Sequence, residues 1–175
     1  MRRTLVLGGA RSGKSAHAEG LLTDAPATYV ATARTNPDDA EWTARIAAHV
    51  RRRPAAWNTI ELPDPAELPK FLEQATGRVL VDDIATWLTA LLDDANAWDG
   101  GDLEHVRQTC DELGTALAAS RAEVVLVSAE VGLGVVPATR SGRLFRDQLG
   151  ALNAALADRC TDVVLLVAGI PLRLR

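Results

Sequence analysis

The sequence predicts an α/β fold in which a mostly parallel sheet is flanked by helices, and three observations support this prediction. Short runs of β-branched and other apolar residues alternate along the chain with longer amphipathic stretches. Several of these runs are apolar at nearly every position, which is typical of strands that are buried on both faces. The last two runs are separated only by Ala168-Gly169, a pair that favours a tight hairpin and therefore an antiparallel strand at one edge.

The individual elements follow from where each pattern starts and stops. The expected strands are Thr4–Leu7, Thr28–Thr32, Arg78–Val81, Glu123–Ser128, Asp162–Val167 and Ile170–Leu174. The expected helices, where apolar residues recur at intervals of three and four, are Lys14–Leu22, Asp38–Arg52, Ile84–Leu92, Asp102–Ser120 and Gly142–Asp158. Two segments rich in turn-forming residues are expected to be soft: Pro63–Pro69 with its three prolines, and Asn96–Gly101 with its paired glycines.

Length and composition restrict the class of protein. A chain of 175 residues that is 47% hydrophobic predicts a single domain over residues 1–175 with a continuous core. The net charge of -4 argues against a nucleic-acid partner, and no apolar run approaches the roughly 18 residues of a membrane span. The two cysteines, Cys110 within an expected helix and Cys160 just past another, favour free thiols and a cytoplasmic location.

The segment after the first strand matches the phosphate-binding loop (P-loop) pattern G-x-x-x-x-G-K-[ST]. Glycines allow consecutive backbone N–H groups to turn around a phosphate, and the following helix offers its N-terminal amides to the same anion. We expect Lys14 to reach the β- and γ-phosphates of ATP or GTP, and the Ser15 hydroxyl to bind Mg²⁺. The nucleotide-binding residues of this loop are Gly8, Gly9, Ala10, Arg11, Ser12, Gly13, Lys14 and Ser15.

Carboxylates follow two other expected strands, where open α/β sheets bind ligands. Asp82 comes directly after a buried run and is preferred as the carboxylate on the metal side, while Asp83 is placed either there or as the cap of the next helix. Glu130 begins a glycine-containing loop and is interpreted equally as a site residue or as a residue that caps a turn. Asp82 and Glu130 are both candidates for the general base of a kinase.

A histidine in an arginine-rich segment is the third candidate feature. Arg45 and His49 are four residues apart and share a helix face, and three further arginines follow before Pro54. Positive neighbours favour a neutral imidazole, which is a nucleophile toward phosphorus. The alternative is a solvated basic helix end with no chemical role. His17 and His105 are interpreted as surface or helix-packing residues.

Taken together, several separate motifs resemble the bifunctional adenosylcobinamide kinase / adenosylcobinamide-phosphate guanylyltransferase family over nearly the full length. The matching segments are Gly8–Ser15, Tyr29-Val-Ala-Thr32, Arg45-Ile-Ala-Ala-His49, Arg53–Glu61, Leu80-Val-Asp82, Glu130–Pro137, Arg143–Asp147, Asn153 and Val167–Leu172. Two positions depart from the family pattern: Ala129 stands where an asparagine is common, and Asp83 where a cysteine is common.

The resemblance implies two reactions and a RecA-like fold. A nucleoside triphosphate, ATP or GTP, phosphorylates the aminopropanol hydroxyl of adenosylcobinamide, and GMP is then transferred from GTP through a guanylylated histidine, which matches His49. The catalytic residues implied are His49, Lys14, Asp82 and Glu130, with Ser15 and Asp82 holding Mg²⁺. Further nucleotide contacts are implied at Ala31, Thr32, Ala33, Arg51, Arg52, Arg53, Pro54, Glu61 and Asp82. The resemblance also implies a homo-oligomer, such as a trimer, in which subunits share a site.

Two other functions fit parts of the sequence. A P-loop small-molecule kinase or NTPase would use the loop alone, with His49 as a helix-end residue. A nucleotide-binding regulatory module would bind GTP without turnover, although the density of ionisable groups beside the loop favours an enzyme.

Overall fold

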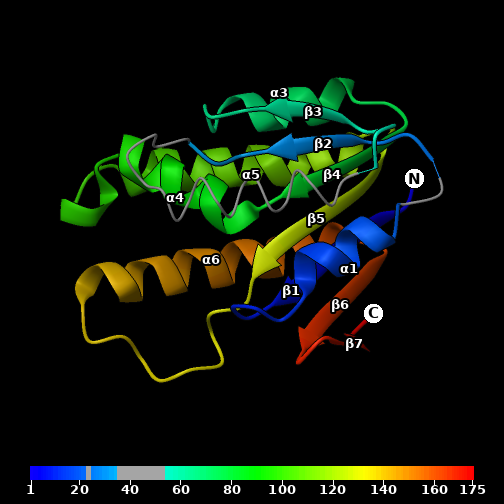
Figure 1. Ribbon diagram of the computed structural model, residues 1–175. Helices are drawn as coiled ribbons and strands as arrows, with labels where there is room; N and C mark the ends of the chain where they lie inside the picture. Colours follow the sequence, from blue (N-terminus) through cyan, green and yellow to red (C-terminus); the bar gives the residue numbers. More distant parts are fainter. Residues whose placement is uncertain (23–24, 35–53) are drawn as a thin grey trace.

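The computed structural model describes residues 1–22, 25–34 and 54–175. In these ranges seven strands form one sheet in the order β3-β2-β4-β5-β1-β6-β7 (Figure 1). All neighbouring strands are parallel except β6 and β7, which are antiparallel. The strands are β1 Arg3–Gly8, β2 Thr28–Ala31, β3 Asn58–Glu61, β4 Arg78–Asp82, β5 Glu123–Ala129, β6 Asp162–Val167 and β7 Ile170–Arg173. The predicted α/β class and the antiparallel edge hairpin are confirmed.

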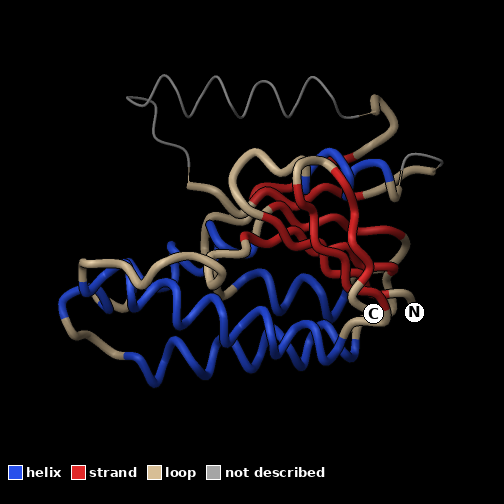
Figure 2. The backbone as a smooth tube through the Cα atoms, turned by 90° about the horizontal axis from the view of Figure 1, so that it is seen from below, coloured by secondary structure: helices blue, strands red, loops and turns tan. Residues whose placement is uncertain are grey.

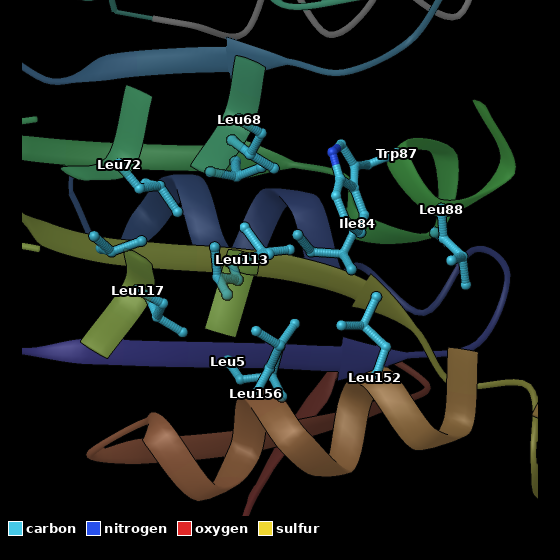
Figure 3. Packing of buried hydrophobic residues seen from close by; sticks show 14 of the residues in the cluster. Leu5, Leu68, Leu72, Ile84, Trp87, Leu88, Leu113, Leu117, Leu152 and Leu156 are labelled. Carbon is cyan, nitrogen blue, oxygen red and sulfur yellow. The ribbon is translucent and has the colours of Figure 1, made fainter. Parts of the chain in front are cut away.

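Helices cover both faces of this sheet, as the apolar strands require. The helices are α1 Lys14–Gly20, α3 Glu67–Gln74, α4 Ile84–Asp94, α5 Leu103–Ala119 and α6 Arg140–Arg159, with a short 3-10 helix at Ala97–Asp99. Leu5 and Leu126 point to the face covered by α3, α4, α5 and α6, whereas Val6 and Val125 point to the face covered by α1. Figure 2 shows the larger helical layer below the sheet, and Figure 3 shows its leucine-rich packing, with Trp87 beside Ile84 at one side of the cluster.

Three helices, α4, α5 and α6, begin at a residue whose side chain caps the first helical turn. The N–H of Thr86 donates to Asp83 Oδ1 at 2.7 Å, and this contact begins α4. The Asp102 carboxylate accepts from the N–H of Glu104 at 2.9 Å at the start of α5. At α6, Thr139 Oγ1 accepts from the N–H of Gly142 at 3.1 Å. Each cap satisfies a backbone donor that the first helical turn leaves unpaired.

The structure corrects the sequence prediction between residues 54 and 74. β3, Asn58–Glu61, was not predicted, because it is a short polar strand at the sheet edge and lacks the apolar pattern of a buried strand. Pro63–Pro69 was predicted to be soft, but α3 begins inside it at Glu67. Pro69 is tolerated there because it lies in the first helical turn, where its missing N–H has no intrahelical acceptor. The predicted helix at 38–52 lies outside the described residues.

Two further predictions concern the state of the cysteines and the lack of a membrane-spanning segment. Cys110 and Cys160 are free, and burial raises the pKa of each thiol to about 12, so neither is an activated thiolate. Among the described residues, no helix combines the length and the apolar character that crossing a bilayer demands.

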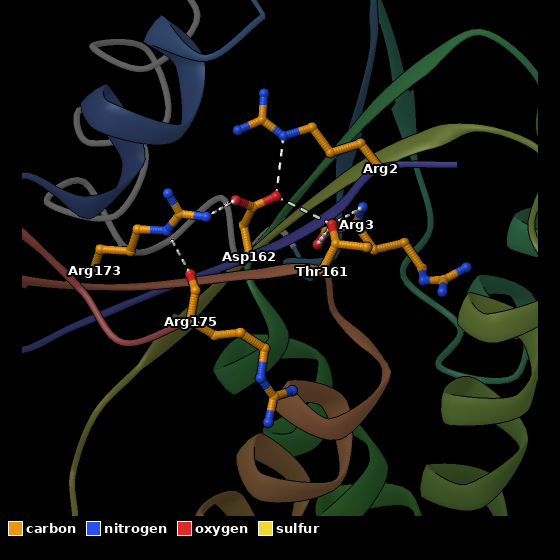
Figure 4. Close-up of polar contacts among 6 residues, drawn as sticks. All are labelled: Arg2, Arg3, Thr161, Asp162, Arg173 and Arg175. Atoms are coloured by element: carbon orange, nitrogen blue, oxygen red, sulfur yellow. Dashed lines mark hydrogen bonds and ion pairs between the residues drawn. The ribbon is translucent and has the colours of Figure 1, made fainter.

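Asp162 joins the beginning of β1 to the last strand, away from the P-loop (Figure 4). Its carboxylate accepts from Arg2 Nε at 3.2 Å and from Arg173 at 3.4 Å, and Thr161 Oγ1 lies 3.1 Å away. Burial by itself raises the pKa of Asp162, but the hydrogen bonds from Arg2 and Thr161 and the two guanidinium charges outweigh it, so the pKa is lowered. The ionised form therefore stabilises the fold.

We expect Asp162→Asn to lower the free energy of unfolding at pH 7 by about 1 kcal/mol, the size of an exposed ion-pair network. Because the folded pKa lies below the unfolded value of about 3.9, this contribution is present above that pH and is lost as the pH falls through the folded pKa. Urea unfolding at pH 7 and in acid should show the gap between wild type and variant closing in acid. Asp158→Asn is the control, since the contact of Asp158 among the described residues is a long 3.9 Å ion pair with Arg175. A gap that persists in acid would contradict this assignment.

Candidate nucleotide-binding site

The P-loop connects the end of β1 to the start of α1, and its backbone requires glycine at two positions. Gly13 has φ of 89°, in the left-handed region that other residues rarely adopt. A Cβ on Gly8 would lie 2.3 Å from Ser12 Oγ and 3.1 Å from Ser12 Cβ, so a side chain at position 8 would force the Ser12 side chain to shift. Arg11, with φ of 56°, also turns the backbone inward. These conformations form the concave nest of N–H groups that binds phosphate in such loops.

Two side chains of the loop are suited to an anion. Ser12 Oγ is buried and has no hydrogen-bond partner within the described part of the chain. An unpaired buried hydroxyl costs free energy, and a phosphate oxygen would satisfy it. Lys14 Nζ folds back over the loop and lies 3.5 Å from the carbonyl oxygen of Gly9. Its charge is therefore placed over the concave side of the loop, where a triphosphate would lie.

Asp82, at the end of β4, faces the P-loop across the sheet edge. Ser15 Oγ donates to Asp82 Oδ1 at 3.3 Å, which brings together the two residues predicted to hold a metal. Tyr29 had no predicted role, yet its buried hydroxyl donates to the other carboxylate oxygen, Oδ2, at 2.8 Å. Tyr29 thereby fixes the rotation of the carboxylate and leaves Oδ1 directed at Ser15. The sequence feature that could have revealed this role is a tyrosine at the second position of β2, the strand that pairs with β4.

The neighbouring carboxylate has a different position and role. Asp83 caps α4 through the N–H of Thr86, and its backbone oxygen accepts from Thr32 Oγ1 at 2.8 Å. Burial raises the pKa of Asp83, and the negative charge of Asp82 raises it further. The structure thus separates the two aspartates that the sequence left ambiguous, since only Asp82 has a hydrogen bond to the P-loop serine among the contacts described.

Of the other predicted residues that the structure describes between β2 and β3, all but one lie at the same edge of the sheet. Ala31 is in register with both Asp82 and Glu61, and Thr32 and Ala33 follow directly. Pro54, in contrast, precedes β3 and lies toward the opposite, amino-terminal edge. The predicted residues His49, Arg51, Arg52 and Arg53 lie outside the described residues.

Glu130 is attached to the P-loop through its backbone. Its N–H donates to the carbonyl oxygen of Gly8 at 3.1 Å, while its carboxylate Oε1 accepts from the N–H of Gly132 at 2.5 Å. The second contact is the turn-capping arrangement, which was one of the two alternatives predicted for Glu130. Nearby, the buried Asn153 accepts from Ser128 Oγ at 2.7 Å and donates to the carbonyl of Ala129 at 3.0 Å, which fixes the end of β5.

The fold and this loop define a P-loop nucleotide-binding protein of the α/β class. A solved ATPase from the type III secretion system of pathogenic bacteria has a similar fold, with a TM-score of 0.52 at 11% sequence identity. That similarity covers 95% of this chain, which spans about half (51%) of the ATPase chain.

The family follows from the sequence comparisons. Residues 4–174 match the family model for cobinamide kinase / cobinamide phosphate guanyltransferase. The chain is 42% identical to the bifunctional adenosylcobalamin biosynthesis protein CobP of Pseudomonas aeruginosa, covering 99% of this chain and 97% of the relative. It is 40% identical to CobU of Salmonella typhimurium, which bears the same bifunctional description, covering 98% of each chain. The chain belongs to this family, and its membership confirms the bifunctional enzyme class predicted from the sequence.

Proposed function

We propose that this enzyme transfers the γ-phosphoryl group of ATP or GTP to the aminopropanol hydroxyl of adenosylcobinamide, and then transfers GMP from GTP to the resulting phosphate. The first transfer forms an O–P bond at γ-phosphorus, breaks the bond from γ-phosphorus to the β–γ bridging oxygen, and releases the nucleoside diphosphate and the hydroxyl proton. The second forms adenosylcobinamide-GDP and releases pyrophosphate. The observation that carries the proposal is the convergence of Lys14, Ser15 and Asp82 beside an anion-binding loop in a chain that matches this family over residues 4–174.

In the kinase half, the residues act mainly by positioning and by charge. The loop N–H groups hold the phosphates, and the Lys14 ammonium stabilises the negative charge that develops on the transferred group. Ser15 and Asp82 supply hard oxygen donors 3.3 Å apart, a donor set that suits Mg²⁺. When bound there, Mg²⁺ would neutralise charge on the β- and γ-phosphate oxygens. Tyr29 keeps the Asp82 carboxylate in the orientation that this role needs.

In the transferase half, we assign the nucleophile to His49. A neutral imidazole nitrogen attacks the α-phosphorus of GTP, and the bond to the pyrophosphate oxygen breaks. The phosphate oxygen of adenosylcobinamide phosphate then attacks the same phosphorus, and the N–P bond breaks. The arginines Arg51, Arg52 and Arg53 would neutralise the triphosphate, while Glu61 and the segment Ala31, Thr32 and Ala33 would contact the nucleotide. Glu130 would hold its loop against the P-loop.

Incubation with Mg²⁺ and GTP labelled at the α-phosphate tests the transferase half. We expect one acid-labile GMP adduct per chain, located by mass spectrometry on the peptide that contains His49. His49→Ala should abolish the adduct and retain phosphorylation of adenosylcobinamide. His105→Ala is the matched control, because that exposed histidine at the start of α5 lies outside the proposed site.

Two results would contradict this assignment. An adduct that survives in His49→Ala would place the nucleophile elsewhere. A wild-type enzyme that phosphorylates adenosylcobinamide without ever being labelled would favour the alternative of a P-loop kinase that lacks the transferase step.

Four properties of the whole protein complete the proposal. We propose one catalytic domain over residues 1–175, assembled as a homo-oligomer such as a trimer. The net charge of -4 disfavours a nucleic-acid partner. The free thiols of Cys110 and Cys160 support a reducing, cytoplasmic location.

A further inference from the structure

We infer that two exposed apolar segments beside the P-loop, which we call the apolar flanks, form the docking surface for the corrin ring of the acceptor. One flank is the β5–α6 loop with Leu133, Val135 and Val136, and the other is the tip of the β6–β7 hairpin with Val167 and Ile170. This inference rests on the proposed kinase function and extends it to the part of the site that binds the acceptor.

The strand order places the flanks on opposite sides of the phosphate site. β1 lies between β5 and β6, so the loops that follow those two strands lie on either side of the loop that follows β1. Each is hydrogen bonded to the P-loop: Glu130 N–H donates to Gly8 O at 3.1 Å, and Gly169 N–H donates to Ser12 O at 3.0 Å. Figure 1 shows the dark blue loop between the yellow β5–α6 segment and the red hairpin.

The larger flank is held in place although its apolar side chains are exposed. Arg146 donates to the carbonyl of Gly132 at 3.0 Å, and Arg143 donates to those of Pro137 and Ala138 at 3.0 and 2.7 Å. The side chains between these anchors remain in solvent: Leu133 is 82% exposed and Val135 is 95% exposed. On the other flank Ile170 is 70% exposed. Clustered apolar exposure in an anchored segment is typical of a binding surface.

The chemistry of the acceptor indicates that its corrin ring is what binds the apolar flanks. In-line phosphoryl transfer requires the acceptor hydroxyl to approach the γ-phosphate from the open side of the P-loop, between the two flanks. A corrin ring is broad and carries many methyl groups, so it offers apolar surface to both flanks while its amide side chains stay hydrated. A second copy of this chain seated on both flanks would cover the entrance to the phosphate site, so we assign this surface to the substrate.

Equilibrium binding of adenosylcobinamide, followed by its visible absorbance in the presence of Mg²⁺ and a non-hydrolysable ATP analogue, tests the inference. We expect Leu133→Ser combined with Val136→Ser, and separately Ile170→Ser, to weaken corrinoid binding tenfold or more, as expected when a buried aliphatic contact is lost. The KM for adenosylcobinamide should rise with it, while affinity for the ATP analogue stays unchanged. Leu174→Ser is the control, because this exposed leucine lies past β7, where its N–H pairs with Val163 near the opposite edge.

The outcomes separate this inference from the proposed function. Unchanged corrinoid affinity in both flank variants, with a wild type that binds and phosphorylates adenosylcobinamide, overturns the inference alone. A changed sedimentation coefficient with unchanged corrinoid affinity also overturns it and assigns the flanks to a subunit contact. A wild type that neither binds nor phosphorylates the corrinoid overturns the proposed function and the inference together.

Discussion

Lys14→Ala is expected to lower kcat/KM for phosphorylation of adenosylcobinamide by two to three orders of magnitude. A preorganised positive charge aimed at developing phosphate charge contributes on this scale, because the site replaces water with fixed donors. Lys14 Nζ already lies over the loop, 3.5 Å from Gly9 O, so the wild-type side chain needs little rearrangement to reach a triphosphate. Steady-state kinetics with ATP and with GTP measure the effect, and thermal unfolding checks that the variant folds.

The sequence provides a close control for this experiment. Lys70 is the other lysine of the chain and is exposed on α3, remote in sequence from the P-loop. Lys70→Ala should leave kcat/KM within about twofold of wild type, as expected for a surface substitution away from the site. Equal losses in the two variants would show that Lys14 has no special role in phosphoryl transfer.

Trp87→Ala is expected to have the largest effect on stability, a loss of about 3–5 kcal/mol in the free energy of unfolding. Trp87 belongs to α4, is 1% exposed and packs among the leucines of the larger helical layer. Its indole N–H donates to the carbonyl of Pro65 at 2.9 Å, so the residue also holds the turn before α3. Removing it leaves a large cavity and an unpaired carbonyl oxygen.

Trp87→Phe separates these two contributions. Phenylalanine keeps most of the buried ring but lacks the N–H donor, so we expect a smaller loss, about 1–3 kcal/mol. Urea unfolding of the three proteins at one pH provides the comparison. A loss in Trp87→Phe equal to that in Trp87→Ala would show that the hydrogen bond to Pro65, and not the packing of the ring, dominates.

The parts of the fold that were predicted correctly are those in which burial leaves a strong pattern. β1, β4, β5 and β6 are covered on both faces, so their apolar runs identified them to within one residue at each end. β3 is an exposed edge strand held by its pairing to β2, and backbone pairing leaves little trace in residue type. α3 was missed because three prolines suggested a loop, although proline is compatible with a first helical turn.

In the candidate site, too, features set by neighbouring residues were predictable from the sequence, whereas contacts between distant residues were not. The P-loop is a continuous motif whose glycines are explained by local sterics, so its position and backbone conformation were predictable from the sequence, and its nucleotide contacts stay predictions. The roles of Asp82 and Asp83 depend on which side chain reaches Ser15, and that contact spans 67 positions of the chain. Tyr29 was missed for the same reason, since its partner lies on a neighbouring strand. The role of His49 stays a prediction.

The contact between Gly169 and Ser12 has a consequence for the order in which the enzyme matures on the ribosome. The phosphate loop is synthesised well before the backbone that braces it from the hairpin, which lies more than 150 positions later in the chain. Pairings between such distant segments form late, because the intervening chain must be ordered before its ends can meet. A nascent chain released before residue 169 should therefore lack the braced loop, and nucleotide affinity should report complete translation of the hairpin.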